Sequence, residues 1–386
     1  MLRVLTLSTL FPDASRPRFG PFVERQTMEL EARPDVDLRV IAPLGLPPGV
    51  LSGLGHYGAL AALPEHEVWA GLDVTRPRFW HFPGTGGRFD PALLTRALLA
   101  KLRRLRKDFP FDVIDAQFFF PDGPAAIRLG RAFGVPVSIK ARGSDIHLWG
   151  QRTATRRQVV SAGKAADGIL AVSAALKADM VALGMPEDRI KVHYTGVDLE
   201  MFKPLSRAKA KAAFGVSGPL IVTVGTLSPR KGQGLVIEAL PSLPDVTLVL
   251  IGNGPDRAAF ERQANAQGVA DRVRFTGSIG HDEIARWLGA ADAMVLPSLS
   301  EGLANVWVEA LACGTPLVIT DVGGAREIVG GPEAGHLALA SANAIADAVR
   351  DLLSNPRDPA TVRKVAERFT WKANTDALYA HLKSLI

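Results

Sequence analysis

The chain has 386 residues, a single cysteine and a formal net charge of +6. This length predicts two domains of roughly 100 to 200 residues, each with its own core, which excludes a small scaffold held together by disulfides. Cys313 has no partner for an internal disulfide, and no run reaches the roughly 20 apolar residues that predict a membrane span.

The N-terminal sequence and the distribution of charge indicate where in the cell the protein is located and which kinds of molecule it binds. No N-terminal stretch has the pattern of a secretory signal peptide, so we expect a cytoplasmic protein, either soluble or peripheral on the cytoplasmic face of the membrane. The whole charge excess lies in residues 1–205, which favours an anionic partner such as a phosphate-bearing substrate or an anionic membrane surface. Nucleic acid is not expected, because no nucleic-acid-binding motif or zinc-ligand spacing is present.

Short apolar runs alternate with helical patterns in the first half of the chain. Residues 3–9 predict a strand, and a loop rich in Pro and Gly separates it from a helical pattern over 21–32. Further strand-like runs lie at 37–43, 112–117, 136–141 and 168–173. Continuous apolar strands separated by helices indicate a parallel α/β topology.

Residues 44–91 interrupt this pattern without a clear periodic signal. A stretch of this length inside an α/β domain is typical of a functional insertion or a mobile loop. The helical pattern over 91–107 then places leucines on one stripe and basic residues on the remaining surface. Either the leucines pack in the domain and the basic face is simply solvated, or that face contacts anionic lipid.

A second cycle of strands fills the remaining chain. Its strand-like runs lie at 220–226, 246–252, 273–277, 293–298 and 316–321, and three helices are expected from about residue 343. The segment 196–219 carries no strand signal and is the best candidate for a linker. We therefore predict Rossmann-like domains over 1–205 and 206–370, followed by a terminal helix over 371–386.

Three loops of the second domain each follow a strand and precede a helix. Open α/β sheets bind ligands at the carboxyl ends of their strands, so two such domains are expected to place a site in an inter-domain cleft. The loops are GTLSPRKG (225–232), GNGPD (252–256) and SLSEGLANVWVE (298–309). In the first of them, Arg230 and Lys231 stand just before a helix start and suit a diphosphate, unless they merely solvate the loop.

Two acidic residues in the third loop are eight positions apart. On one helix, Glu301 and Glu309 would lie about 12 Å apart along the axis and about 80° apart around it, so they cannot share one substrate atom. Glu301 would lie at the N-terminal end of the helix, either in contact with a ligand or as a solvated acidic residue of the loop. Glu309 would lie two turns inside, where vicinal sugar hydroxyls or a structural ion pair could satisfy it.

The segment SLSEGLANVWVEALACGTPLVITDVGGAREIV (298–329) resembles the donor-binding signature of family 4 glycosyltransferases, which have the GT-B fold. With GTLSPRKG upstream, the resemblance covers essentially the whole C-terminal domain. It extends more weakly into the N-terminal domain, through Gly20 and Pro21, PDGPAA (121–126), KARGSDIH (140–147) and TGVDLEMFKP (195–204). The GT-B fold implies two Rossmann-like domains that face a cleft, with the C-terminal helix packing back on the N-terminal domain.

The resemblance also implies roles for individual residues. Lys231, helped by Arg230, would bind the pyrophosphate, Glu309 the ribose hydroxyls, and Glu301 the transferred sugar. The remaining donor contacts that it implies are Gly20 near the phosphates, Gly277 and Ser278 beside the base, and the backbone of Gly302, Leu303, Ala304 and Asn305.

The implied reaction is sugar transfer with retention of anomeric configuration, without a metal or other cofactor. The donor would be a nucleoside diphosphate sugar. The acceptor would be a carbohydrate, such as a lipid-linked oligosaccharide in polysaccharide or lipopolysaccharide assembly.

The sequence departs from the family pattern at two positions. Thr226 follows Gly225 where an arginine is common, and Arg142 stands where many members have a histidine that has been considered for acceptor activation. Arginine stays protonated near neutral pH and cannot act as a general base. We therefore expect Arg142 to face the departing phosphate or an anionic acceptor. Asp145 would then orient Arg142 or contact the acceptor itself, unless the two residues form a purely structural pair.

Two weaker acceptor candidates and two other functions stay open. Asp122 could orient the acceptor or cap a turn, and His147 could approach the acceptor or be an ordinary surface or core residue. On the same fold, the chain could be a sugar-nucleotide epimerase or a glycosyl-phosphate synthase. It could also be a non-catalytic sugar-nucleotide sensor, which Arg142 alone favours.

Overall fold

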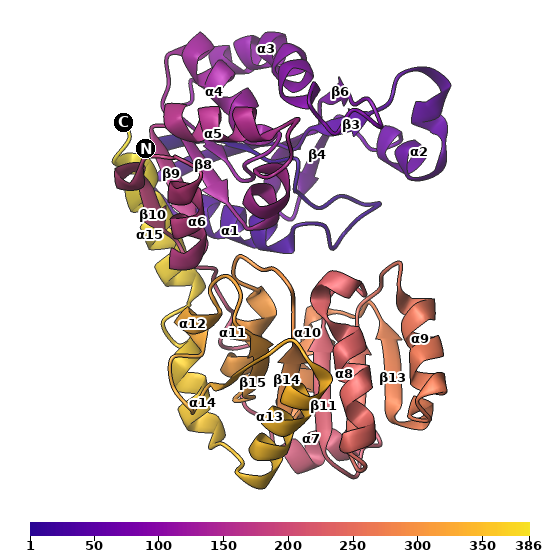
Figure 1. Ribbon diagram of the computed structural model, residues 1–386. Helices are drawn as coiled ribbons and strands as arrows, with labels where there is room; N and C mark the ends of the chain where they lie inside the picture. Colours follow the sequence, from indigo (N-terminus) through magenta and orange to yellow (C-terminus); the bar gives the residue numbers. More distant parts are fainter. The chain divides into compact units, whose positions relative to one another are not determined.

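The computed structural model describes residues 1–386, and the chain divides into two compact units. The first unit comprises Met1–Tyr194 and Trp371–Ile386, and the second comprises Thr195–Thr370. Each unit is a sheet of mainly parallel strands with helices packed against it (Figure 1). The predicted α/β class is therefore confirmed.

The first unit is built on an eight-stranded sheet of order β10-β9-β8-β7-β1-β2-β5-β4, in which only the pair β4 and β5 is antiparallel. Every residue of β7, β8 and β9 is buried, as expected for strands that are covered on both faces. The strands are β1 (Leu2–Leu7), β2 (Val36–Ile41), β4 (His66–Trp69), β5 (Leu72–Thr75), β7 (Val113–Ala116), β8 (Val137–Ala141), β9 (Gly168–Ala171) and β10 (Ile190–Val192).

The last helix of the chain belongs to the first unit. It contacts the first helix, and its Leu378 and Leu382 join the core that contains Val4 and Leu30. Gly168 makes room for it, because a Cβ there would lie 2.5 Å from the ring of His381. The larger helices of this unit are α1 (Pro21–Glu31), α3 (Asp90–Asp108), α4 (Asp122–Phe133), α5 (Arg156–Ala165), α6 (Ala174–Ala182) and α15 (Trp371–Lys383). None of the chain's helices is long and apolar enough to cross a membrane.

Most of residues 44–91 is folded into short elements. Strands β4 and β5 extend the main sheet, while β3 (Leu44–Leu46) pairs with β6 (Arg78–Trp80) in a separate two-stranded sheet. Between them lie the 3-10 turn η1 (Gly49–Gly53) and the helix α2 (Gly55–Ala61). We call residues 44–63 together with β6 the α2 lobe. It has its own small core, formed by Leu44, Leu60 and Leu63.

The second unit has a six-stranded, fully parallel sheet of order β13-β12-β11-β14-β15-β16. Its strands are β11 (Leu220–Val224), β12 (Thr247–Ile251), β13 (Val273–Gly277), β14 (Ala293–Leu296), β15 (Leu317–Thr320) and β16 (Gly335–Ala338). Its helices are α7 (Arg207–Ala213), α8 (Gln233–Ala239), α9 (Arg257–Ala266), α10 (His281–Ala290), α11 (Asn305–Ala312), α12 (Ala325–Ile328), α13 (Ala342–Ser354) and α14 (Pro359–Ala366).

The N-terminal segment of the first unit ends at Tyr194, before the boundary that the sequence placed near residue 205. The segment after Tyr194 is held by the second unit, because Arg363 of α14 donates to the backbone oxygens of Phe202 and Leu199 at 2.7 and 2.9 Å. The N–H of Val197 also donates to the oxygen of Phe369, at 2.7 Å. These contacts join residues far apart in the sequence, and no local pattern marks them.

Candidate functional site

Three strands of the second unit end in loops that are hydrogen-bonded to one another. After β11, Gly225 donates its N–H to the last residue of β12, and Leu227 donates to the oxygen of Asn253. After β12, Gly252 donates to the oxygen of Gly277 at 2.9 Å. The carboxyl ends of β11, β12 and β13 therefore form one continuous backbone surface, which includes the predicted base contact Gly277.

The loop that carries the predicted phosphate ligands is fixed against the loop after β14. Gly232 has a left-handed conformation (φ 73°), and a Cβ there would lie 2.1 Å from the oxygen of Pro297. The N–H of Leu299 donates to the oxygen of Arg230 at 2.8 Å, and the Arg230 guanidinium donates to the oxygen of Ser300 at 2.8 Å. Only glycine at position 232 permits this close approach.

Lys231 and Glu301 form an ion pair. The Nζ of Lys231 donates to the Oε1 of Glu301 at 2.5 Å, and the two side chains are only 15% and 9% exposed. An ammonium group has three N–H donors, so two remain for the oxygens of a diphosphate while the pair is intact. The structure thus brings together two residues that the sequence assigned to separate parts of a donor.

The backbone around Glu301 is supported by the loop after β15. Gly323 has φ 52°, and a Cβ there would lie 2.2 Å from the oxygen of Glu301. The N–H of Gly324 donates to the oxygen of Gly302 at 2.8 Å. Ala304 is the N-cap of α11 and no side chain caps this helix, so backbone N–H groups at its start can donate hydrogen bonds to an anion. The predicted backbone contacts Leu303 and Asn305 flank that N-cap.

Glu309 lies within α11 and is partly exposed. Desolvation raises the pKa of its carboxyl group to about 7. The structure gives this carboxylate no cationic partner, so the ion pair that the sequence left open does not form within the second unit. A carboxyl group in this state is suited to accept hydrogen bonds from neutral donors such as hydroxyls.

In the first unit, the guanidinium of Arg142 is held by Gln117. Its Nε donates to the backbone oxygen of Gln117 at 2.8 Å, and its Nη2 donates to the side-chain Oε1 at 2.5 Å. The group also lies over the ring of Phe22, with 4.7 Å from Cζ to the ring centroid. Burial lowers the pKa of Arg142 to about 10, so the side chain remains a cation at neutral pH.

Asp145 binds backbone groups, and its carboxylate forms no ion pair with the Arg142 side chain. It accepts the N–H groups of Arg142, Gly143 and Phe119 at 2.8 to 2.9 Å. Burial raises the pKa of this fully buried carboxyl group. Its observed contacts fix the loop that carries Arg142, and they replace the guanidinium pair that the sequence suggested.

The remaining predicted residues differ in their burial and in their contacts. Asp122 is fully buried, and its Oδ2 accepts a hydrogen bond from the N–H of Thr9 at 2.9 Å, whereas its Oδ1 has no partner. Burial raises the pKa of this carboxyl group to about 7. His147 Nε2 lies 2.9 Å from Asp179 Oδ2, as a surface histidine would. Gly20 is the left-handed N-cap of α1 (φ 74°). Ser278, in the second unit, is exposed after β13.

A buried polar chain behind Arg142 was missed by sequence reasoning. The Oε1 of Gln117 also accepts from Gln26 at 2.8 Å, Gln26 accepts from Lys140 at 2.7 Å, and Lys140 contacts His193 Nδ1 at 2.5 Å. His193 Nε2 donates to the oxygen of Asn374 on α15 at 2.8 Å. Burial, reinforced by the Arg142 charge, lowers the Lys140 pKa well below its ordinary value. The available signal was a lysine in an otherwise apolar, buried strand.

Two family models match the chain. The model described as glycosyltransferase family 4 matches residues 57–201, and the model described as glycosyl transferases group 1 matches residues 206–369. The two matches follow one another along the chain and cover most of it.

Several relatives are named as glycosyltransferases. The putative teichuronic acid biosynthesis glycosyltransferase TuaC of Bacillus subtilis is 29% identical over 90% of this chain and 88% of its own length. A GDP-mannose-dependent alpha-(1-6)-phosphatidylinositol monomannoside mannosyltransferase of Mycolicibacterium smegmatis is 32% identical over 62% of this chain and 66% of its own length. A D-inositol 3-phosphate glycosyltransferase of Mycobacterium tuberculosis is 36% identical over 53% and 45%, respectively.

Solved structures share the fold over the full chain. A sucrose-phosphate synthase from Thermosynechococcus elongatus has a TM-score of 0.80 at 22% identity, and 100% of each chain is covered. Anabaena HepE in complex with UDP-glucose has a TM-score of 0.74 at 20% identity, also over 100% of each chain. At this level of identity the likeness shows the fold alone, and that fold is the GT-B architecture that the sequence predicted.

Proposed function

This chain belongs to the family 4 glycosyltransferases, and we propose that it transfers a sugar from a nucleoside diphosphate sugar to a carbohydrate with retention of anomeric configuration. The observation that carries the proposal is the pair of Lys231 and Glu301 beside the uncapped start of α11. A cation, a hydrogen-bond acceptor and free backbone N–H groups meet there, as a sugar diphosphate requires.

We assign the parts of the donor to separate groups of the second unit. Lys231 and Arg230 take the diphosphate, Glu301 takes hydroxyls of the transferred sugar, and Glu309 takes the ribose. Two of the comparisons support the donor class: HepE, which shares the fold, is in complex with UDP-glucose, and the name of the M. smegmatis relative specifies GDP-mannose. Both compounds are nucleoside diphosphate sugars, and we propose the class without choosing between them.

The proposed reaction needs no divalent metal. Lys231, Arg230 and the start of α11 supply positive charge next to the diphosphate, and charge-assisted hydrogen bonds are about twice as strong as neutral ones. The acceptor hydroxyl attacks the anomeric carbon from the side of the leaving group. As the bond from the sugar to the β-phosphate breaks, the released phosphate oxygen takes the hydroxyl proton, so configuration is retained.

One experiment separates this function from its alternatives. A thermal-shift screen of nucleoside diphosphate sugars identifies the donor, because a ligand at 100 times its Kd stabilises by about 2.7 kcal/mol. NMR of the product, with and without EDTA, then reports its anomeric configuration. We expect a retained linkage that EDTA does not suppress. Inversion would refute the mechanism. Release of an epimer from donor alone would indicate an epimerase, and transfer only to an added sugar phosphate would indicate a glycosyl-phosphate synthase. Donor binding without turnover would indicate a sensor.

For the acceptor, we propose a lipid-linked glycan that is reached from the cytoplasmic face of the membrane. The name of the M. smegmatis relative specifies a phosphatidylinositol monomannoside, which is a lipid-linked sugar, and the name of the B. subtilis relative specifies the biosynthesis of teichuronic acid. The outer face of α3 supports a peripheral position, because its exposed side chains include Arg96, Arg103 and Arg104, while Leu94 and Leu98 are buried.

Arg142 is expected to act as a fixed cation during transfer. Arg142→Ala should lower kcat by about 100-fold with little change in donor KM, because a charge-assisted contact to the departing phosphate or to an anionic acceptor is lost. Arg142→Lys should retain part of the activity, since it keeps the charge but loses the fork that binds Gln117. Steady-state kinetics measures both variants, with Arg156→Ala on the exposed start of α5 as the control.

The histidine variant tests the alternative route directly. Arg142→His supplies the side chain that many family members carry at this position. If this variant exceeded the parent in kcat between pH 6 and 8, a histidine base would explain the reaction better than phosphate assistance does.

A further inference from the structure

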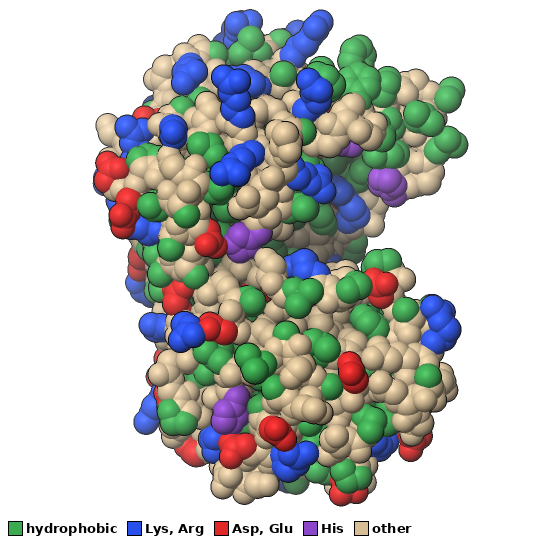
Figure 2. Space-filling view, in the orientation of Figure 1, with side chains coloured by type: hydrophobic (Ala, Val, Ile, Leu, Met, Phe, Trp, Pro, Cys, Tyr) green, Lys and Arg blue, Asp and Glu red, His purple; other side chains and the backbone are tan.

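The α2 lobe exposes a cluster of apolar side chains. Val50, Leu51 and Leu54 are 86%, 52% and 60% exposed, and η1 contains no buried residue. We call these three residues the apolar tip. Figure 2 shows apolar side chains gathered on the part of the first unit that carries α2. Water-exposed apolar clusters of this kind mark interaction surfaces, because they cost free energy unless another surface covers them.

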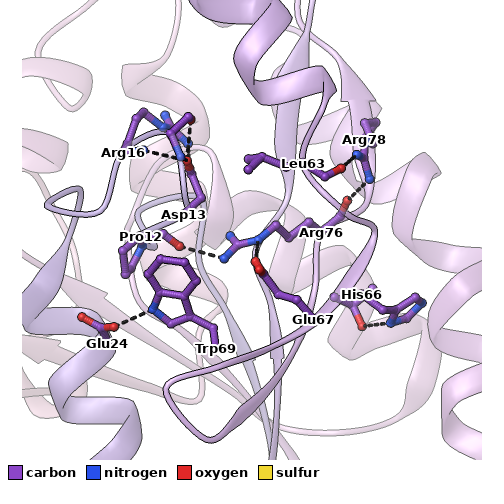
Figure 3. Close-up of polar contacts among 12 residues, drawn as sticks. Pro12, Asp13, Arg16, Glu24, Leu63, His66, Glu67, Trp69, Arg76 and Arg78 are labelled. Carbon is purple, nitrogen blue, oxygen red and sulfur yellow. Dashed lines mark hydrogen bonds and ion pairs between the residues drawn. The ribbon is translucent and has the colours of Figure 1, made fainter.

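The base of the lobe is fixed, so the tip is held in a defined place. Arg78 donates to the backbone oxygen of Leu63 just after α2, and the fully buried Arg76 donates to Glu67 and to the oxygen of Pro12 at 2.8 Å (Figure 3). These contacts join the segment around β6 to the end of α2 and to the loop after β1. The part of the lobe from which the apolar tip extends is therefore held in place by hydrogen bonds.

A basic surface lies next to the lobe in the same unit. Helix α3 packs against β6, and Lys101 of α3 is hydrogen-bonded to Glu65, just beyond α2. The exposed side chains of α3 include four cations for which the structure records no carboxylate partner: Arg96, Arg103, Arg104 and Lys107. Figure 2 shows Lys and Arg side chains over this part of the first unit.

We propose that the α2 lobe is a membrane anchor: the apolar tip inserts into the interface of an anionic bilayer, and the basic face of α3 contacts the lipid phosphates. Stable peripheral binding takes two such signals, since either one alone gives marginal affinity. A second copy of this chain fits the surface less well, because two basic faces would repel each other. The inference builds on the proposed lipid-linked acceptor but concerns a surface that has no part in the chemistry.

A fluorescent label can report insertion of the tip in the full-length chain. The only native cysteine, Cys313, is buried, and burial raises its pKa to about 12, so it will not compete for a thiol-reactive dye. The dye is placed at Leu51→Cys or, as control, at Leu339→Cys, an apolar position in the second unit that is 79% exposed. With vesicles of phosphatidylcholine and about 30% phosphatidylglycerol, we expect a blue shift at position 51 only.

Substitutions then separate the two signals. Replacing Val50, Leu51 and Leu54 together with Ser should weaken binding to these vesicles by about tenfold or more, whereas Leu339→Ser should bind like the parent. Arg103→Glu with Arg104→Glu should weaken binding by a similar factor and reduce its salt dependence.

Three outcomes would overturn the proposal. They are an unshifted label at position 51, a serine variant that binds vesicles like the parent, and light scattering that shows the serine changes dissociating a dimer. Sugar transfer to a water-soluble acceptor is measured in parallel without vesicles. If the parent transferred no sugar, the proposed function would be wrong. If the parent transferred sugar but did not bind vesicles, only the proposed membrane anchor would be wrong.

Discussion

Replacing Lys231 with Ala should lower kcat/KM for the donor by about 100-fold to 1000-fold. The change removes a charge-assisted hydrogen bond to the proposed diphosphate. It also leaves the carboxylate of Glu301, now 2.5 Å from the ammonium group, without its partner and close to an anionic ligand. Both effects act in the same direction, and steady-state kinetics with varied donor concentration measures their sum.

A double substitution shows whether the ion pair is the cause. Lys231→Ala with Glu301→Gln should lose less activity than the two single losses combined, because removal of the acidic charge relieves the repulsion that Lys231→Ala creates. Lys364→Ala, an exposed lysine of α14, should leave kcat/KM unchanged. A kcat/KM at the parent level for Lys231→Ala would mean that the diphosphate binds elsewhere.

The central strands of both sheets could be predicted from the sequence, whereas several edge strands could not. Residues 220–226 and 246–252 are apolar runs, and the structure has β11 and β12 there, buried in the middle of the sheet. By contrast, β10 and β16 lie at sheet edges and are only partly buried, so they lack the continuous apolar run of an inner strand. Pairing with a neighbouring strand defines such elements, and local pattern does not show it.

The same distinction applies to the site. The loop motifs located Lys231 and Glu301, because strand, loop and helix follow one another within a short stretch of sequence. Their ion pair joins residues 70 positions apart and depends on how the two loops fold together. Spacing alone suggested a side-chain pair of Arg142 with Asp145. The guanidinium instead reaches Gln117, which is 25 residues away in the sequence and belongs to no recognisable motif.

Glu309→Ala should weaken donor binding by about 100-fold, because two hydroxyl hydrogen bonds to a charged acceptor are lost, each worth roughly 1.5 kcal/mol or more. Calorimetry measures the change in Kd. Glu283→Ala, in the first turn of α10, is the matched control in the same unit and should bind donor like the parent. If Glu309→Ala bound donor as tightly as the parent does, the ribose assignment would be wrong.

The raised pKa of Glu309 makes donor binding depend on pH. Near its pKa of about 7, a large part of the population is protonated, and hydroxyl donors favour the ionised form. Donor affinity should therefore rise from pH 6 to 8, and binding at pH 7 should release protons, which calorimetry in buffers of different ionisation enthalpy detects. Glu309→Gln carries no titratable group at this position, so its affinity should be nearly flat over that range.

The pH dependence of the free energy of unfolding gives an independent check of the raised pKa of Glu309. The folded-state pKa of about 7 lies above the ordinary value of 4.5, so between these pH values the folded state binds more protons than the unfolded state. The free energy of unfolding therefore falls as pH rises through this window, and the penalty is complete above pH 7. Without donor, Glu309→Gln should be more stable than the parent by about 1 to 2 kcal/mol at pH 8 and similar at pH 4. Equal stability at pH 8 would mean that Glu309 is ordinarily solvated, and the pH dependence of donor binding should then be absent as well.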